Sequence, residues 1–307
     1  MWRFAALLAV VLPVDHAAPP VAPEALIGRW DITITGSDRP LPSWLEVRPS
    51  GNGYLVGQFV GVVGSARPIA RVELTDGAMR FAIPPQWEQG KGDLVVEGRL
   101  TGESLVGTMT FPDGTRRDWK GVRAPSLRRT STPTWGAPIR LFNGNDLTGW
   151  RAMGANQWRA VNGVLTSPKS GSNLVTDRTF TDYKLHLEFR YPKGSNSGVY
   201  QRGRYEVQIE DSLTTEPQND LLGGIYGFIA PSEVMAKRPG EWQTYDITLV
   251  GRRVTVVLNG KTVIADQVIP GPTGGALDAN EGAPGPVYLQ GDHGAVEFRK
   301  VVITPAR

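Results

Sequence analysis

The chain of 307 residues is a succession of short strand-like runs, and no stretch carries a sustained apolar stripe of helical period. The clearest run is YKLHLEFRY, residues 183–191. Because successive side chains of a strand point to opposite faces, this run separates an apolar set from a polar set. The apolar set is Tyr183, Leu185, Leu187, Phe189 and Tyr191, and the polar set is Lys184, His186, Glu188 and Arg190. Such runs, separated by turn signals such as PSGNG and PDGT, predict an all-β protein with few helices.

The runs fall into two regions joined by a segment without periodicity. Residues 26–123 hold strand-like runs at hairpin spacing, which predict a small antiparallel β-barrel or sandwich domain. Its opening, LIGRWDI, resembles the Gly-x-Trp start of lipocalin-like barrels. Residues 124–138 are rich in Pro, Ser, Thr and Arg and read as a linker. Residues 139–307 form a second strand-rich domain, with a hairpin expected through Asn259 and Gly260.

The first 22 residues have the layout of a secretory signal peptide. After a basic start comes the apolar run FAALLAVVLPV, followed by small and Pro-rich residues. The apolar run is too short to span a bilayer, so no membrane span is expected there. The layout predicts removal of residues 1–22 and a periplasmic or secreted product.

Charge and cysteine content exclude several classes of function. The 33 basic and 30 acidic residues nearly cancel, and no Lys/Arg cluster alternates with aromatics, so no nucleic-acid partner is expected. The chain has no cysteine, which excludes disulfides, thiolate metal sites and a cysteine nucleophile. Nothing in the sequence specifies an oligomeric state.

One strand-like run places polar groups where a buried strand would not need them. In EVQIE, Glu206, Gln208 and Glu210 point one way while Val207 and Ile209 point the other. The polar face of this run is therefore either exposed to solvent or the lining of a site.

Five segments in order carry a resemblance to a known family. They look like the successive motifs of the 3-keto-disaccharide hydrolase domain family and span about residues 139–305. The resemblance implies a concanavalin-like jelly roll of two antiparallel sheets, and activity on glycosides already oxidised at C3. The segments are LFNGNDLTGW (141–150), NSGVYQRGRYEVQIEDS (196–212), GGIYG (223–227), GEWQTYDI (240–247) and LQGDHGAVEFRKVVI (289–303).

The chemistry that the resemblance implies needs a base and a stabilised oxyanion. A ketone at C3 acidifies the hydrogen at C2, so a positioned base can remove it, and the enolate can then expel the C1 substituent. Water then adds to the resulting enone. Donors must stabilise the developing charge on O3. Amides and arginine would hold the sugar hydroxyls, and an aromatic side chain would stack on the sugar.

Two residues are the candidate catalytic groups. Glu206 lies in the matching RYEVQ segment and would act as the base or as a metal ligand, the alternative being a solvated or salt-bridged carboxylate. His293 lies in the Gly-flanked turn QGDHG, where loops often carry function. Gln208 shares the face of Glu206. Gln290 is a candidate substrate-binding residue, although the inserted Gly291 changes its spacing from the family pattern.

Further candidates come from other motifs of the resemblance. His186 and Glu188 lie in LHLEFR and could bind substrate, and His186 with His293 and Glu206 could hold a divalent metal ion if the three converge. Asn196, a further candidate for substrate binding, and Ser197 are expected to form a turn whose Gly198 permits close approach of the backbone. The last candidates for substrate binding are Arg202, which could instead pair with an acidic residue, and Tyr226, which could instead be a buried core aromatic.

Two alternatives stay open at this point. EVQIE also resembles the ExDxE signature of laminarinase-type glycosidases, in which Glu206 and Glu210 would be nucleophile and acid. The jelly roll also hosts carbohydrate-binding proteins without activity, since a fold does not determine a function.

Overall fold

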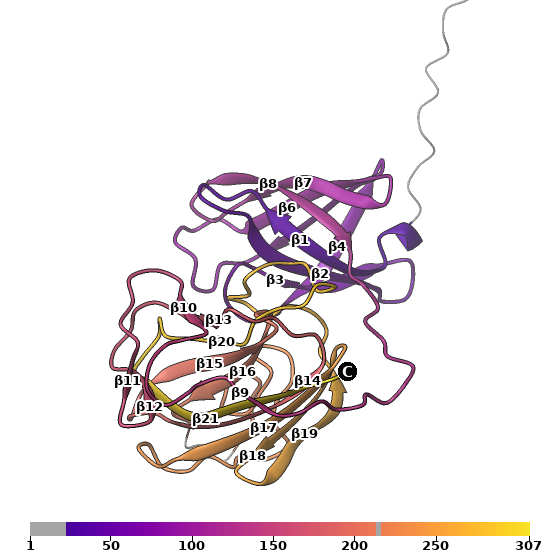
Figure 1. The fold of residues 1–307 in the computed structure, drawn as a ribbon. Coiled ribbons are helices and arrows are strands. Elements are labelled where there is room, and N and C mark those ends of the chain that lie inside the picture. The colour runs from indigo at the N-terminus through magenta and orange to yellow at the C-terminus, as the bar shows by residue number, and fades with distance from the viewer. Residues whose placement is uncertain (1–22, 213–215) are drawn as a thin grey trace, which may run out of the picture.

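The structure is a computed structural model that describes residues 23–212 and 216–307. The predicted signal peptide, residues 1–22, lies outside the described residues. Apart from one 3-10 turn, Pro23–Ala25, the regular elements of the described residues are strands (Figure 1). The all-β prediction, with a jelly-roll sandwich preceded by a small antiparallel barrel, is confirmed. No described helix is long and apolar enough to cross a membrane.

The first eight strands close into an antiparallel barrel, because each pairs with the next and β8 pairs back to β1. Trp30 at the start of β1 is fully buried inside, and its indole nitrogen donates to the carbonyl of Leu26. The strands are β1 (Gly28–Ile34), β2 (Leu41–Pro49), β3 (Leu55–Val60), β4 (Arg67–Thr75), β5 (Ala78–Ile83), β6 (Leu94–Thr101), β7 (Ser104–Thr110) and β8 (Arg116–Arg123).

The remaining strands form a sandwich of two antiparallel sheets. A five-stranded sheet has the order β10-β13-β20-β15-β16, and an eight-stranded sheet has the order β11-β12-β21-β14-β17-β18-β19, with β9 paired to β21. The five-stranded sheet consists of β10 (Trp150–Ala152), β13 (Leu174–Thr176), β15 (Asn196–Gln201), β16 (Tyr205–Glu210) and β20 (Tyr288–Leu289). The other sheet consists of β9 (Ile139–Arg140), β11 (Arg159–Val161), β12 (Val164–Ser167), β14 (Tyr183–Arg190), β17 (Gln243–Val250), β18 (Arg253–Leu258), β19 (Lys261–Val268) and β21 (Val296–Pro305).

Local sequence determines the turns and faces of these strands. The expected hairpin through Asn259 and Gly260 joins β18 to β19, and both residues have the positive φ that a type I′ turn requires, 52° and 84°. The five alternating apolar residues, four on β14 and Tyr191 just after it, are buried in the sandwich core, as the alternation predicts. On β16 the buried core positions are Tyr205, Val207 and Ile209, so Glu206 and Gln208 face away from the core.

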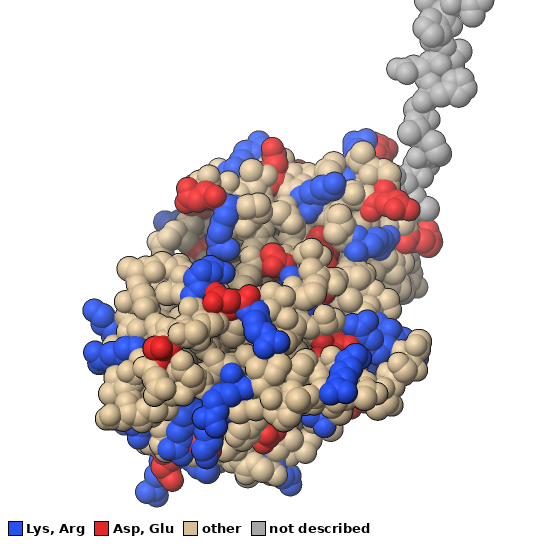
Figure 2. Space-filling view, viewed as in Figure 1, with Lys and Arg blue, Asp and Glu red and all other residues tan. Residues whose placement is uncertain are grey.

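The barrel lies against the polar side of the five-stranded sheet. Figure 1 shows the segment between β19 and β20, in yellow, reaching up to β2 and β3 of the barrel. Within this contact the amide of Gly275 donates to the carbonyl of Val62, at 2.9 Å. The rings of Trp44 from the barrel and Phe228 from the sandwich meet edge to face, 5.3 Å apart. Charges of both signs are interspersed on the face seen in Figure 2.

Candidate active site

A cavity of about 340 Å³ lies between the polar face of the five-stranded sheet and the barrel. The sheet supplies its floor through β15, β16 and β20, and the loop after β20 supplies one wall. Its lining residues are Arg39, Val62, Val63, Gly64, Met153, Asn173, Asn196, Tyr200, Glu206, Gln208, Tyr226, Gly274, Gly275, Ala276, Leu277, Tyr288, Gln290, Asp292 and His293.

The cavity brings together most of the candidate residues that the sequence predicts. Both candidate catalytic groups, Glu206 and His293, line it, although they are 87 positions apart (293 minus 206). Four candidate substrate-binding residues line it as well: Asn196, Gln208, Tyr226 and Gln290. Their roles stay predictions, but their convergence is a feature of the fold.

Glu206 is a buried carboxyl group with a strongly shifted pKa. The side chain lies on the polar face of β16, where its residue is 3% exposed. Burial raises the pKa of Glu206 to about 8, and the negative charges of Asp292 and Glu210 add to this effect against a hydrogen bond from Tyr200. A carboxyl group with a pKa near 8 is protonated for much of the time at neutral pH and becomes a strong base when it ionises.

The neighbouring strand makes room for this carboxyl group by a glycine. Gly198 on β15 lies diagonally across from Glu206, since Gly198 pairs with Gln208 and Tyr200 pairs with Glu206. A Cβ atom on Gly198 would lie 2.0 Å from Oε1 of Glu206. Any other residue at position 198 would therefore push the carboxyl group aside. The turn expected at Asn196 and Ser197 is wrong, because both lie within β15, and Gly198 is explained by the close approach of the Glu206 side chain.

Tyr200 connects Glu206 to the segment that touches the barrel. Its hydroxyl lies 2.8 Å from Oε2 of Glu206 and 2.9 Å from the carbonyl oxygen of Gly274. A carbonyl only accepts, so when the hydroxyl donates to Gly274 its oxygen can accept from a protonated Glu206. When Glu206 ionises, the hydroxyl can turn and donate to the carboxylate instead. Tyr200 thus has a partner in both protonation states of Glu206.

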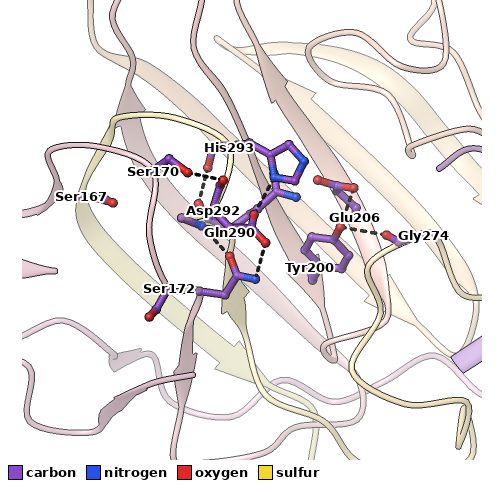
Figure 3. A network of polar contacts seen from close by, with 12 residues as sticks. Ser167, Ser170, Ser172, Tyr200, Glu206, Gly274, Gln290, Asp292 and His293 are labelled. Atoms are coloured by element: carbon purple, nitrogen blue, oxygen red, sulfur yellow. Dashed lines mark hydrogen bonds and ion pairs between the residues drawn. The ribbon is translucent and has the colours of Figure 1, made fainter. Parts of the chain in front are cut away.

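The opposite wall of the cavity holds a carboxylate–imidazole pair. Nδ1 of His293 lies 2.6 Å from Oδ1 of Asp292 (Figure 3). The side-chain amide of Asn173 donates to Oδ2 of Asp292 at 3.0 Å. The hydrogen bond to Asp292 raises the pKa of His293. Burial would raise the pKa of Asp292, but the bonds from His293 and Asn173 outweigh burial and lower it. The pair therefore favours imidazolium beside carboxylate.

Two amide side chains complete the polar lining. Oε1 of Gln290 is buried and has no hydrogen-bond partner among the described residues, so it can accept from a hydroxyl group in the cavity. Nε2 of Gln208 donates to the carbonyl of Asp220, at 3.1 Å. The backbone amide of Tyr226 donates to the carbonyl of Glu206, which holds the Tyr226 segment beside β16.

His186 and Glu188 do not reach the cavity, contrary to their predicted role. Both lie on β14 in the other sheet, and their polar face points out of the sandwich. His186 is paired with Asp246, Nδ1 to Oδ1 at 2.7 Å. Glu188 forms ion pairs with Arg299 and Lys300. Alternation on a strand predicts which residues share a face but not which of two sheets that strand joins.

The metal hypothesis required His186, His293 and Glu206 to converge, and His186 lies on the other sheet. Within residues 23–212 and 216–307 no group of three or more His, Cys, Asp or Glu side chains is placed to hold a metal ion. The donor set expected from sequence therefore does not fit a metal site in this fold.

Arg202 is a structural residue of the turn between β15 and β16. It is fully buried, with a positive φ of 51°. Its guanidinium donates to the hydroxyl of Tyr205 and to the carbonyl of Gly251, at 2.9 and 3.1 Å. It does not line the cavity. The neighbouring Arg204 forms an ion pair with Asp278, at 2.8 Å.

Glu210, the second carboxylate of the glycosidase alternative, lies outside the cavity lining. Its carboxylate instead accepts a long hydrogen bond, 3.4 Å, from the amide of Gln208. Burial raises its pKa, with further contributions from Asp220 and Asp211. Glu206 thus shares the cavity with the Asp292–His293 pair, whereas Glu210 on the same strand does not line it.

Several lining residues were missed from sequence. Two of them could have been predicted: Tyr200 alternates onto the same strand face as Gly198, and Asp292 directly precedes His293. Asn173 and Arg39 could not, because they come from segments distant in sequence.

Comparisons with known proteins bear on residues 137–304, which match the model of a family described as the 3-keto-alpha-glucoside-1,2-lyase-like domain. A Bacteroides thetaiotaomicron protein named 3-keto-disaccharide hydrolase is 28% identical over 101 residues, which cover 29% of this chain and 33% of the relative. The match thus spans about a third of the relative's length.

Solved structures with similar chains include a candidate glycosyl hydrolase from Parabacteroides distasonis, with 26% identity and a TM-score of 0.46. That alignment covers 57% of this chain and 92% of the other. A non-specific endo-beta-1,3(4)-glucanase from family GH16 aligns with 14% identity and a TM-score of 0.38, over 60% of this chain and 93% of the other.

Proposed function

Because the chain belongs to the 3-keto-alpha-glucoside-1,2-lyase-like domain family, we propose that it is an exported carbohydrate-active enzyme that cleaves 3-keto-glycosides. One observation carries the proposal: the buried, high-pKa carboxyl of Glu206 shares a single cavity with the Asp292–His293 pair. A base of raised pKa that shares a cavity with a carboxylate-bound histidine supplies two proton-transfer groups for elimination next to a ketone.

In the first step Glu206 removes the C2 proton of the bound 3-keto-glycoside. The C2–H electron pair becomes the enolate, whose negative charge rests on O3. Burial supports this role because it makes the ionised carboxylate a stronger base than an exposed one. At pH 7 a group with a pKa of about 8 is ionised in roughly a tenth of molecules, a modest loss against the gain in basicity.

In the second step the enolate re-forms the ketone and the C1–O bond breaks. The bonding electrons go to the glycosidic oxygen, which takes a proton from the His293 imidazolium. Asp292 supports this role because its hydrogen bond keeps His293 protonated at higher pH than a free imidazole. Water then adds to C1 of the enone, C2 regains a proton, and the net result is hydrolysis.

The remaining lining residues would bind the sugar. Gln290 offers a buried acceptor without a partner, Asn196 offers an amide, and Tyr226 offers a hydroxyl beside the Glu206 strand. Burial raises the pKa of Tyr226, and nearby Glu206 adds to this, so its hydroxyl stays protonated and can donate to O3. These contacts are the proposed source of specificity for the oxidised sugar.

Purified protein incubated with a 3-keto-glucoside and with the parent glucoside tests the proposal. We expect release of the C1 substituent from the keto form alone, because only a ketone acidifies C2. Binding of both compounds without turnover of either would show a carbohydrate-binding protein. Cleavage of an unoxidised β-glucan would instead favour a glycosidase that uses Glu206 and Glu210.

Export of the chain is a separate part of the proposal and has its own test. Expression with a C-terminal tag, followed by fractionation, should place a shortened chain outside the cytoplasm. Full-length chain confined to the cytoplasm would contradict it.

A further inference from the structure

The barrel contributes directly to the cavity, although it lies outside the part of the chain that matches the family model. Arg39 comes from the loop between β1 and β2, and residues 62–64 come from the loop between β3 and β4. Val62, Val63 and Gly64 line the cavity beside the 274–277 segment of the sandwich. The cavity is therefore incomplete without the barrel.

The contact between barrel and sandwich at this point is tightly built. Besides the hydrogen bond between Gly275 and Val62, the backbones meet so closely that a Cβ on Gly274 would lie 2.2 Å from the carbonyl oxygen of Gly64. The Gly274 carbonyl is the group that Tyr200 contacts, so the barrel loop lies against the backbone that supports the Glu206–Tyr200 pair.

A second, fully buried contact anchors the same sandwich segment. Asp31 of β1 meets Glu281, and Glu281 accepts hydrogen bonds from Arg252 and from the hydroxyl of Tyr205, at 3.0 and 2.6 Å. Burial, together with the charge of Glu281, raises the pKa of Asp31 to about 9, so the two carboxyl groups can share a proton. This network ties β1 of the barrel to the sandwich segment between β19 and β20.

The part of the cavity next to the barrel differs chemically from the part around Glu206. Val63 and Met153 are 45% and 39% exposed and line the cavity, so they supply apolar surface at its mouth, alongside the exposed side chains of Asp292 and His293. Arg39 lines the same cavity, is exposed, and forms no ion pair with a described residue. Its guanidinium donates a long hydrogen bond, 3.5 Å, to the carbonyl of Leu277. A guanidinium without an ion-pair partner can bind an anion, and the apolar side chains of the cavity can contact a flat apolar group that carries this anion.

We propose that the barrel forms the leaving-group half of the cavity, and that Arg39 selects aglycones that join an apolar ring to an anionic group. This rests on the proposed function, because the leaving group is the part of a 3-keto-glycoside that extends beyond C1. The sugar occupies the polar part near Glu206 and Gln290, and the aglycone lies against Val63 and Met153 with its anion on Arg39.

The proposed role of Arg39 can be tested with 3-keto-glucosides that share the sugar but differ in aglycone. The aglycones are 4-carboxyphenyl, phenyl and methyl, and each compound is used as both anomers. For the Arg39→Ala variant of the full chain we expect kcat/KM on the carboxyphenyl substrate to fall about tenfold to a hundredfold, as loss of a charge-assisted hydrogen bond predicts. The methyl substrate should change less than about threefold. Arg39→Lys should restore part of the loss. Arg80→Ala, on a barrel arginine with exposed partners away from the cavity, is the matched control.

The outcomes separate this inference from the proposed function. If wild-type protein consumes the methyl substrate and Arg39→Ala affects all three aglycones equally or not at all, the aglycone assignment is wrong. If no keto substrate reacts, the proposed function fails, and calorimetric binding of the unoxidised 4-carboxyphenyl and phenyl glucosides still decides the inference. Equal affinity of wild type and Arg39→Ala for the carboxyphenyl compound would overturn it.

Discussion

The two sheets of the sandwich carry the same kind of alternating strand and use it in opposite ways. On β14 the polar face holds His186, whose ring nitrogen contacts Asp246, and Glu188, which forms ion pairs with Arg299 and Lys300. On β16 the polar face holds Glu206 and Gln208, which the barrel encloses in a cavity. Glu188 has its pKa lowered, since two cationic partners outweigh burial, whereas burial raises the pKa of Glu206. What covers a face, and not the pattern of the strand, decides whether its carboxylates are structural or reactive.

The largest expected effect is that of Glu206→Gln, compared with the same change at Glu188 on the other sheet. Glu206→Gln should lower kcat on a 3-keto-glucoside by about a thousandfold, within the range of general base catalysis, because the amide cannot accept the C2 proton. Glu188→Gln should stay within about twofold of wild type. Circular dichroism of both variants checks that they fold. A fully active Glu206→Gln protein would remove the distinction between the two faces.

Gly198→Ala tests whether the floor of the cavity holds the base in place. The added methyl would clash with Oε1 of Glu206 and displace it, and displacement of a reacting group by about 1 Å can cost about a hundredfold in rate. Gly282→Ala is the control, since its Cβ would meet nothing closer than 3.9 Å. Unchanged kinetics in Gly198→Ala, with a melting temperature like wild type, would show that Glu206 needs no such fixed position.

Asp292→Asn and Asp246→Asn compare the carboxylate partner of His293 in the cavity with the carboxylate partner of His186 on the other sheet. Asp292→Asn removes a hydrogen bond that raises the pKa of His293 and a charge that raises the pKa of Glu206. Both pKa values should fall, so the pH–rate profile should move to lower pH while the maximal rate drops about tenfold. Asp246→Asn, at the partner of His186, should leave the profile where it is. A profile of Asp292→Asn that stays in place would show that His293 and Glu206 do not titrate in the reaction.

The smallest expected effect is on stability. The pKa of Glu206 is about 8 in the folded chain against 4.5 when exposed, so the folded state binds the extra proton. Stability from this group is fully present below about pH 4.5 and is lost as the pH rises toward 8, at most about 1.4 kcal/mol per pH unit. Glu206→Gln should therefore unfold at higher urea concentration than wild type at pH 8.5, with a smaller difference at pH 5. A constant difference across this range would mean that Glu206 titrates normally.

Sequence alone supports the fold further than the site. Alternation and turn signals predict the strands and the faces of β14 and β16, because these depend on neighbouring residues. Family motifs predict Glu206 and His293, which the structure places at one cavity. They also suggest His186 and Arg202, which do not line the cavity. A motif does not show which sheet a strand joins or which way a turn residue points. The contribution of Arg39 and Val63 depends on how the barrel docks, which no local pattern encodes.

The fate of the hydrogen at C2 tests the central claim most directly. A 3-keto-glucoside labelled with deuterium at C2 would be incubated with enzyme in ordinary water, with an enzyme-free sample to correct for spontaneous exchange, and the released sugar analysed by mass spectrometry. The account predicts that wild-type protein releases sugar without the label, and that Glu206→Gln releases neither sugar nor label. Full turnover with the deuterium still at C2 would contradict it, because the C1–O bond would then break without removal of the C2 proton by Glu206.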